Sequence, residues 1–575
     1  MPEYLSPGVY IEELPGPKPI EGVGTSTGAF VGIAERGPVN DPQLITNLTQ
    51  YADTFGGFIP GGFLAYAVNH FFTEGGTRCY VVRAFKASAA TTPNPDLARV
   101  TLRRTNDPAS EEVMSVFASS EGSWANKNIS VRAEPHGFDP EDPKPPATVQ
   151  SNKKFKLSVF FKGDRTPVEV FDHLSMNEFQ GNTTFPNPDH IEKKINGISK
   201  YITVADKTKD TTKIDPPFFP LIDPVTNLPN PLPEDKAVAE VLPTLDGGKD
   251  LSLVLSAGDA NAIEFKVLDL IGEVATATKK ATGLQAFDAV DDINIVAIPD
   301  LVNLAFSPQD SRDATIKGFN YCEARKDCFF VADTPQGFSP QAALGYRRGV
   351  APSPATGGAF NSKFGAIYYP WFFATDPITG KRKLVPPSGA VAGSYAEADG
   401  RVGVHKAPAG TEVGFLNSAV EVERAITKGE QDTLNPEGVN VIRKFPDSGI
   451  VIWGARTVSS DPEWRYVNVR RLFNFLEESI LKGTQGLVFE PNDPSLWKRI
   501  IRDVSAFLKI QWMEGKIIGN KMEQAFFVKC DEETNPPESM DLGRVVTLIG
   551  VCPSKPAEFV IFRIKQTRFG GDVEE

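Results

Sequence analysis

The glycine-rich segment Gly22–Gly28 is the first place where the sequence could bind a ligand, because successive backbone amides can hold a phosphate. A P-loop needs a Lys followed by Ser or Thr, and a dinucleotide site needs the spacing GxGxxG; GVGTSTG has neither. The segment also precedes an apolar strand-like run, whereas a phosphate loop joins a strand to a helix. We interpret it as a turn and predict no cofactor.

Histidines and cysteines are scattered too widely for a metal site or a disulfide framework that the sequence could reveal. No HExxH, CxxC or short ligand pair occurs, so the sequence predicts no metal site. Most cysteines lie in apolar stretches, which predicts reduced, buried thiols. The residues concerned are His70, His136, His173, His190, His405, Cys79, Cys322, Cys328, Cys530 and Cys552.

A serine nucleophile with a histidine base is the remaining enzymatic possibility. Gly24-Thr25-Ser26 is faintly similar to the nucleophile segment of subtilisin-like proteases, and His405 could serve as the base. The order of these groups along the chain is wrong for those proteases, and no matching sequence surrounds either residue. We therefore predict no catalytic residue and keep a serine hydrolase only as a remote alternative.

Composition places the chain among folded proteins of several domains. It has 575 residues, of which 41% are apolar and 23% charged, and one hydrophobic core does not grow to that size. The formal net charge of −13 disfavours non-specific binding to nucleic acid or to an anionic membrane. No secretory signal and no apolar run long enough for membrane insertion are visible, so assembly in the cytoplasm is expected.

Both ends of the chain carry a strand pattern without an obvious local partner. Near the start, Val9, Tyr10, Ile11 and Glu12 alternate between two faces, and prolines at positions 7, 15, 17 and 19 isolate them from a hairpin partner. Near the end, a run alternates in the same way but is apolar on nearly both faces. It consists of Phe559, Val560, Ile561, Phe562, Arg563 and Ile564. The partner of each strand must lie elsewhere in the chain or in another chain.

Strand and helix patterns alternate in two blocks that a different region separates. Residues 28–33 and 79–83 are buried-strand runs with a helix pattern at 63–72 between them. The same alternation resumes near residue 290 with strand runs that are apolar on both faces, as in a sheet covered by helices on each side. Residues 91–280 instead contain proline clusters and short alternating runs, which predict an inserted β-rich domain with long loops.

Two helices are marked in the last quarter of the chain. Each opens with Asp-Pro, at positions 461–462 and 493–494, which suits a capping residue followed by the first helical position. Gly483 is expected to end the first helix. The second helix carries an apolar stripe and, beside it, a basic stripe of Lys498, Arg502 and Lys509. Strand patterns at 544–551 and 558–564 follow.

Several long motifs occur together in one order, and in that order they resemble the tail sheath family of contractile phages and related injection particles. The match covers residues 1–90 and 290–570. The segments that carry the resemblance include YLSPGVYIEELPGP, GTSTGAFVGIAERGPVNDPQLITNLTQYADTFGG, LNPEGVNVIRKFPDSGIVIWGARTVSS and AEFVIFRIKQ. The most specific match is LVPPSGAVAGSYAEADGRVGVHKAPAG, residues 384–410.

The resemblance implies an α/β, multidomain fold and a mechanical function. In that family, hexameric rings stack in a helix around an inner tube and contract to drive the tube through a target envelope. The middle domain is subtilisin-like without catalysis. Other expected partners are baseplate and terminator or cap proteins, with sibling sheath proteins where these exist. The expected parts are an N-terminal arm (1–20), an N-terminal α/β portion of the core (21–90), an inserted β-rich outer domain (91–280), a subtilisin-like domain (281–455) and a C-terminal domain with its strand arm (456–575).

In that family the terminal arms reach into neighbouring subunits and complete a shared sheet, with an open sheet edge of the core as the acceptor. For the stripe on the second helix, we expect either plain solvation or contact with acidic groups of the inner tube. A non-contractile capsid-like or surface-layer protein is the alternative structural function. The sequence favours a phage tail or a phage-like particle as the location, without choosing between them.

Overall fold

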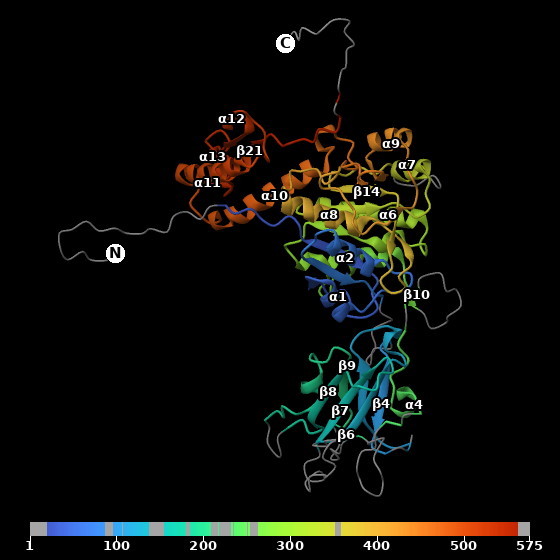
Figure 1. Cartoon of the computed structure of the whole chain (residues 1–575). Coiled ribbons are helices and arrows are strands. Elements are labelled where there is room, and N and C mark those ends of the chain that lie inside the picture. Colours follow the sequence, from blue (N-terminus) through green and yellow to red (C-terminus); the bar gives the residue numbers. More distant parts are fainter. Residues whose placement is uncertain are drawn as a thin grey trace, which may run out of the picture.

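A computed structural model gives the fold (Figure 1). It describes residues 20–561 apart from 87–95, 106, 108, 137–153, 180–184, 209–216, 218–231, 234, 250, 253–262, 351–357 and 560. The N-terminal arm, including Val9, Tyr10, Ile11 and Glu12, lies outside the described residues, as do Val560, Phe562 and Ile564.

An eight-stranded sheet is the centre of the molecule. Its strand order is β19-β18-β14-β13-β12-β1-β3-β2, and the six strands from β18 to β3 are parallel, whereas β2 and β19 pair antiparallel at the two edges. The strands are β1 (Gly28–Gly32), β2 (Gln43–Ile45), β3 (Cys79–Arg83), β12 (Ile295–Ala297), β13 (Phe329–Asp333), β14 (Gly365–Tyr369), β18 (Val439–Phe445) and β19 (Gly449–Ile452).

Helices cover both faces of this sheet, as the two-sided apolar strand runs predict. Side chains alternate along β13: Phe329 and Val331 enter one core cluster, and Phe330 and Ala332 enter the other. One face carries α1 (Leu48–Phe55), α2 (Leu64–Thr73) and α8 (Ser388–Arg401). The other carries α5 (Val267–Ile271), α6 (Pro308–Arg325), α7 (Pro340–Arg348) and α9 (Lys428–Leu434).

A small antiparallel sheet, β16-β15-β17, extends the first of these faces. Its strands are β15 (Phe372–Thr375), β16 (Arg382–Val385) and β17 (Glu421–Val422).

The inserted region forms a separate body beside the main sheet (Figure 1). Two three-stranded antiparallel sheets, β4-β5-β9 and β6-β7-β8, share one apolar cluster that runs from Ala98 to Leu245. Its elements are β4 (Arg99–Arg103), β5 (Glu112–Ala118), β6 (Ile129–Pro135), β7 (Lys154–Phe161), β8 (Glu169–Ser175), α3 (Ile191–Ile195), β9 (Ile202–Asp206) and α4 (Val238–Val241).

The end of the insertion is nearer residue 250 than residue 280. Phe265, Leu270 and Leu284 pack in the core cluster of the main sheet and not in the cluster of the insertion. Between them and the insertion lies a two-residue parallel pair, β10 (Leu251–Ser252) with β11 (Ile263–Glu264). We therefore propose 91–250 as the inserted unit.

The C-terminal unit consists mainly of helices around a β-hairpin. It contains α10 (Val467–Thr484), α11 (Pro494–Met513), α12 (Met522–Ala525), β20 (Phe526–Lys529), α13 (Pro537–Asp541) and β21 (Leu548–Val551). The strand expected at 544–551 is thus shorter than its pattern. In the expected strand at 558–564, Glu558, Phe559 and Ile561 are described and lie in no strand.

Helix α11 begins as predicted, because Asp493 accepts hydrogen bonds from the amides of Ser495 and Leu496. The prediction for the first helix was wrong at both ends. Asp461 caps only a short 3₁₀ turn, Pro462–Trp464, and α10 starts after it. Gly483 lies inside α10, where a Cβ atom would come within 2.7 Å of Ile20. This glycine makes room for the incoming chain instead of ending the helix.

Candidate subunit interface

Residues 20–23 attach the N-terminal arm to the C-terminal part of α10, and we call this attachment the N-terminal arm root. Ile20, the first described residue, is 5% exposed and belongs to the same apolar cluster as Leu472 and Phe475. The amide of Val23 donates a hydrogen bond of 3.1 Å to the hydroxyl of Ser479. Residues 20–23 are therefore fastened to α10, and the arm of residues 1–19 starts from that point.

Glu558 attaches the C-terminal arm near the N-terminal end of the same helix, and we call this attachment the C-terminal arm root. Arg456 donates from Nε and Nη2 to the two carboxylate oxygens at 2.9 and 2.5 Å. Asn435 adds a hydrogen bond of 2.7 Å and the hydroxyl of Tyr466 one of 3.2 Å. Burial alone would raise the pKa of Glu558, but these partners hold it below its ordinary value. Beyond this cluster, Phe559 and Ile561 are 72% and 76% exposed.

Helix α10 separates the two roots. It has 18 residues and is therefore about 27 Å long. Ile20 packs near the C-terminal end of this helix, and Glu558 is hydrogen bonded to Tyr466 at its N-terminal end. The two attachment points are thus separated by about the length of α10, and a contact that propagates from subunit to subunit uses two different surfaces.

The hairpin of β20 and β21 is the best candidate acceptor for an incoming strand. The two strands pair antiparallel with each other and with no other strand in the described part of the chain, so each has an outer edge without a strand partner. Phe527 and Leu548 are 52% and 53% exposed. An apolar groove of about 690 Å³ lies beside β21. Its lining comes from α10, α11, the loop between them and β21 itself, and includes Ile480, Leu487, Val488, Phe489, Leu496, Ile500 and Ile549.

Phe489 stands at this groove fully exposed and in a strained backbone conformation. Its φ of 71° is in the left-handed region, which a bulky side chain rarely occupies. Neither burial nor backbone preference of the isolated subunit accounts for a phenylalanine at this position. Strain and exposure together are typical of a residue that another chain covers.

One edge of the main sheet, the strand β19, is a poorer acceptor than an open edge. The outer side of β19 is already hydrogen bonded by its own chain: the amide of Leu416 donates to the carbonyl of Ile450, and the amide of Ile452 donates to the carbonyl of Gly414. A neighbouring strand would have to displace residues 410–416 to pair there.

The structure places Lys498, Arg502 and Lys509 together on the exposed side of α11. The opposite side packs into the core of the C-terminal unit through Val504, Phe507 and Leu508. Arg502 pairs with its neighbour Asp503 at 2.9 Å. The three basic side chains therefore form an accessible stripe on one face of this unit.

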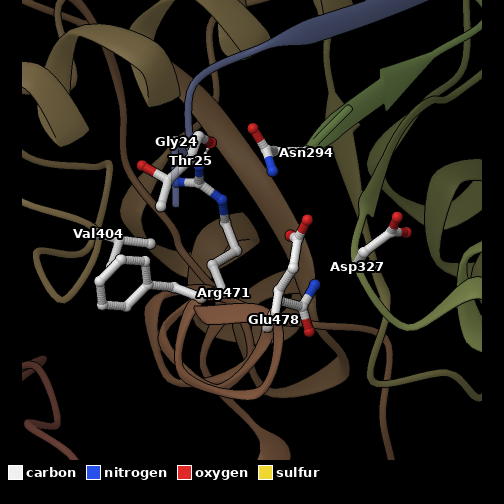
Figure 2. Close-up of a pocket in the computed structure, with 9 residues that line it drawn as sticks. Gly24, Thr25, Asn294, Asp327, Val404, Arg471 and Glu478 are labelled. Carbon is white, nitrogen blue, oxygen red and sulfur yellow. Dashed lines mark hydrogen bonds between the residues drawn. The ribbon is translucent and has the colours of Figure 1, made fainter. Parts of the chain in front are cut away.

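A buried ion pair connects α10 to α8. Its arginine, Arg471, also lines a pocket of about 10 Å³ (Figure 2). Arg471 lies 2.6 Å from Asp399, and both side chains are almost fully buried. Burial raises the pKa of Asp399, although Arg471 opposes this. Arg471 also donates to the carbonyl of Thr25 at 3.0 Å. The pair thus joins the start of the chain, the main sheet and the C-terminal unit.

The same region bears on the serine hydrolase alternative. His405 lies near Asp399, but the carboxylate is engaged by Arg471, and Nδ1 of His405 is buried without a hydrogen-bond partner. A catalytic base would need that nitrogen held by the carboxylate. The described residues therefore show no Ser-His-Asp relay at Ser26. Of the five cysteines, four are buried as expected, and Cys552 is exposed.

Two adjoining family models match the chain. Residues 274–458 match the phage tail sheath protein central domain, and residues 459–567 match the phage tail sheath C-terminal domain. The chain belongs to the phage tail sheath family. Together the two matches cover about half of the chain, and the arm roots at Glu558 and on α10 lie within the second.

Curated relatives of this sheath protein include a tail sheath protein of Vibrio phage KVP40, 26% identical over 44% of this chain and 38% of the relative. A putative prophage major tail sheath protein of Pseudomonas aeruginosa is also 26% identical, over 54% of this chain and 75% of the relative. The chain spans less than two fifths of the length of the KVP40 protein that it matches.

Solved sheath structures share the fold. The sheath complex of an extracellular contractile injection system, PVC, in its contracted state has a TM-score of 0.53, with 19% identity and coverage of 99% of both chains. A sheath tail protein from Listeria innocua has a TM-score of 0.55, with 12% identity over 93% of this chain and 96% of that chain. In the described residues, no helix has the length and apolar character needed to cross a membrane.

Proposed function

We propose that the chain is the structural subunit of a contractile sheath: hexameric rings of it stack in a helix around an inner tube, and contraction drives the tube through a target envelope. Membership of the tail sheath family is the observation that carries this proposal. Its partners would be further copies of itself, the tube protein, the baseplate and a terminator or cap protein. It would act as part of a phage tail or a phage-like particle, without catalysis.

Strand exchange is the proposed link between subunits. Val9, Tyr10, Ile11 and Glu12 of one neighbour, and residues 559–564 of another, would add strands to the hairpin of β20 and β21. The exposure of Phe559 and Ile561 in the isolated subunit supports this, as do the outer edges of the hairpin and the groove beside it. About five backbone hydrogen bonds at ~1 kcal/mol each would hold each added strand while the subunits rotate.

The main sheet would serve as a rigid body between these links. Its parallel strands with helices on both faces agree with the subtilisin-like middle domain that the family resemblance implies, and we propose that assignment for residues 281–455. The buried Arg471–Asp399 pair would keep this body fixed to the C-terminal unit during contraction.

Substitutions at the donor and the acceptor test this function. Ile11→Pro removes a ladder hydrogen bond from the arm and lies outside the folded body. Phe489→Asn removes the exposed ring and leaves a residue that tolerates a positive φ. We expect both variants to remain folded monomers by circular dichroism, and to form no tubes by electron microscopy. Deletion of residues 1–14 should act like Ile11→Pro.

The matched control is Leu304→Asn, which removes a similarly exposed apolar side chain far from the hairpin. This variant should still form tubes of two lengths, extended and contracted. Contractile tubes from Ile11→Pro would show that the arm does not link subunits. Unfolding of that monomer would show instead that the strand belongs to its own subunit.

A further inference from the structure

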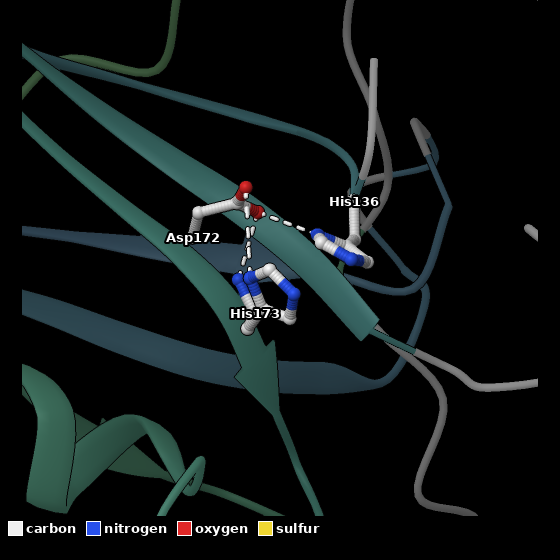
Figure 3. A group of neighbouring side chains, drawn as sticks. All are labelled: His136, Asp172 and His173. Carbon is white, nitrogen blue, oxygen red and sulfur yellow. Dashed lines mark hydrogen bonds and ion pairs between the residues drawn. The ribbon is translucent and has the colours of Figure 1, made fainter.

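Two histidines and an aspartate lie close together in the insertion, although no metal-binding motif is visible in the sequence (Figure 3). His136 follows β6, whereas Asp172 and His173 lie on β8. Nδ1 of His136 is 2.8 Å from one carboxylate oxygen of Asp172, and Nδ1 of His173 is 3.7 Å from the other. One ligand atom from each residue lies within 4.8 Å of the other two. No short ligand pair occurs in the sequence, and these three residues come together only in three dimensions.

A β-bulge brings two consecutive residues of β8 to the same place. Along β7 and β8, Phe155 pairs with Leu174 but Leu157 pairs with Phe171, so β8 contains an extra residue at Asp172 and His173. In a regular strand these two side chains would point to opposite faces. His173 has a φ of 57°, in the left-handed region, and its ring centre lies 3.6 Å from that of His136. The bulge thus turns His173 toward the group.

Two nearby lysines among the described residues form their ion pairs with another carboxylate and not with that of Asp172. The two nearby lysines, Lys154 and Lys194, are paired with Asp189 at 2.8 and 3.0 Å. The side chains of His136, Asp172 and His173 are 29%, 41% and 53% exposed. A metal ion could therefore enter from solvent and keep water in its remaining positions.

We propose that His136, Asp172 and His173 form a binding site for a divalent transition metal on the insertion, with zinc as the metal that best fits the ligands. Two imidazoles and one carboxylate suit zinc, cobalt or nickel, whereas magnesium and calcium prefer oxygen ligands throughout. Three protein ligands with an open position are a common zinc arrangement. Such a site would cross-link β6 to the bulge of β8.

Metal titration of the full-length chain, free of any affinity tag, tests the site. Calorimetry with Zn²⁺ should give one ion bound per chain, and Co²⁺ should give the visible absorption bands of nitrogen coordination. His136→Gln and Asp172→Asn should each weaken Zn²⁺ binding about tenfold or more. His173→Asn should do the same while keeping a residue that tolerates the positive φ.

His405→Gln is the matched control, because it removes an imidazole far from the insertion and should leave Zn²⁺ affinity unchanged. Circular dichroism checks that each variant is folded, and Asp172→Asn keeps the test available if a histidine variant unfolds. Zn²⁺ affinity that is equal in the wild type and all three variants would overturn the proposal. So would no bound Zn²⁺ in the wild type, or Mg²⁺ binding as tight as Zn²⁺.

Discussion

Single residues decide where the two arms leave the subunit. Glu558 makes four hydrogen bonds to three side chains at one end of α10. Ile20 occupies the space that Gly483 leaves at the other end. Force on an arm would be transmitted through these contacts to the helix, so we expect the two attachment points to matter mechanically as much as the strands that we propose to be exchanged.

Removing the carboxylate charge should release the C-terminal root. In Glu558→Gln, Arg456 loses its anionic partner. Because the Arg456 side chain is only 9% exposed, its charge is left largely buried without a counter-charge, which costs about 3 kcal/mol of local stability. Hydrogen exchange of residues 552–559 should become faster by a large factor. Glu463→Gln, at an exposed site nearby, is the control and should not change the exchange. If residues 552–559 of Glu558→Gln exchange as slowly as in the wild type, Glu558 does not hold the C-terminal arm in place.

The pH dependence of the same contact has a definite sign. Because the pKa of Glu558 is lowered in the folded chain, its contribution to stability is present above the ordinary glutamate pKa. That contribution is lost as the pH falls through the lower, folded-state value. Exchange of residues 552–559 should therefore be insensitive to pH near neutrality, after correction for the intrinsic rate, and increase only in acid.

At the scale of an element, α11 has two faces with different functions. One face packs into the C-terminal unit, whereas the other carries Lys498, Arg502 and Lys509 in solvent. We propose that the basic face contacts acidic groups of the inner tube in the extended state. Paired charges near solvent are weak and sensitive to salt, which suits a contact that must break on contraction.

Reversal of all three basic residues to Glu should prevent assembly of the sheath on tubes. The monomer should keep its thermal stability, because these side chains lie outside the core. A matched control reverses Lys279, Lys280 and Lys317, which are also exposed, and changes the net charge equally. Electron microscopy and co-sedimentation with tubes are the measurements. Normal extended particles from the first triple variant would show that the stripe is only solvated.

At the scale of the whole molecule, the insertion is a separate core that is nevertheless docked to the main body. The guanidinium of Arg36 lies 5.7 Å from the ring centre of Trp124 and 5.1 Å from that of Tyr201. Arg83 donates to the carbonyl of Glu121 at 2.9 Å. These contacts fix the direction in which the insertion projects without merging the two cores.

Replacing residues 91–250 with a short Gly-Ser linker should still give contractile tubes, with a smaller outer diameter. The main body should lose about 1 kcal/mol of stability, because Arg36 no longer stacks on aromatic rings. Electron microscopy gives the diameter, and thermal unfolding gives the stability. A soluble monomer that forms no tubes would show that the insertion is part of the lattice.

The sequence alone was enough to predict the elements with strong local signals. Apolar runs on both faces predicted β1, β3, β13 and β14, because a parallel sheet covered on each side leaves no polar face. The Asp-Pro pair at 493–494 predicted the start of α11, because capping depends on neighbouring residues. The order of the long motifs gave the family, and hence the proposed function. Signals near Asp461 and Gly483 failed where tertiary packing overrode local preference.

Only the tertiary structure decided which distant residues meet. Arg456 and Glu558 are far apart in sequence, as are Asp399 and Arg471, and no spacing rule brings such pairs together. Residues 410–416 cover β19 through a long-range contact, which is why we propose the hairpin of β20 and β21 as the acceptor instead. His136 and His173 meet because a bulge reverses one side chain, and bulges depend on how two strands pair. Local chemistry determined the elements, and packing between distant segments determined the surfaces and sites.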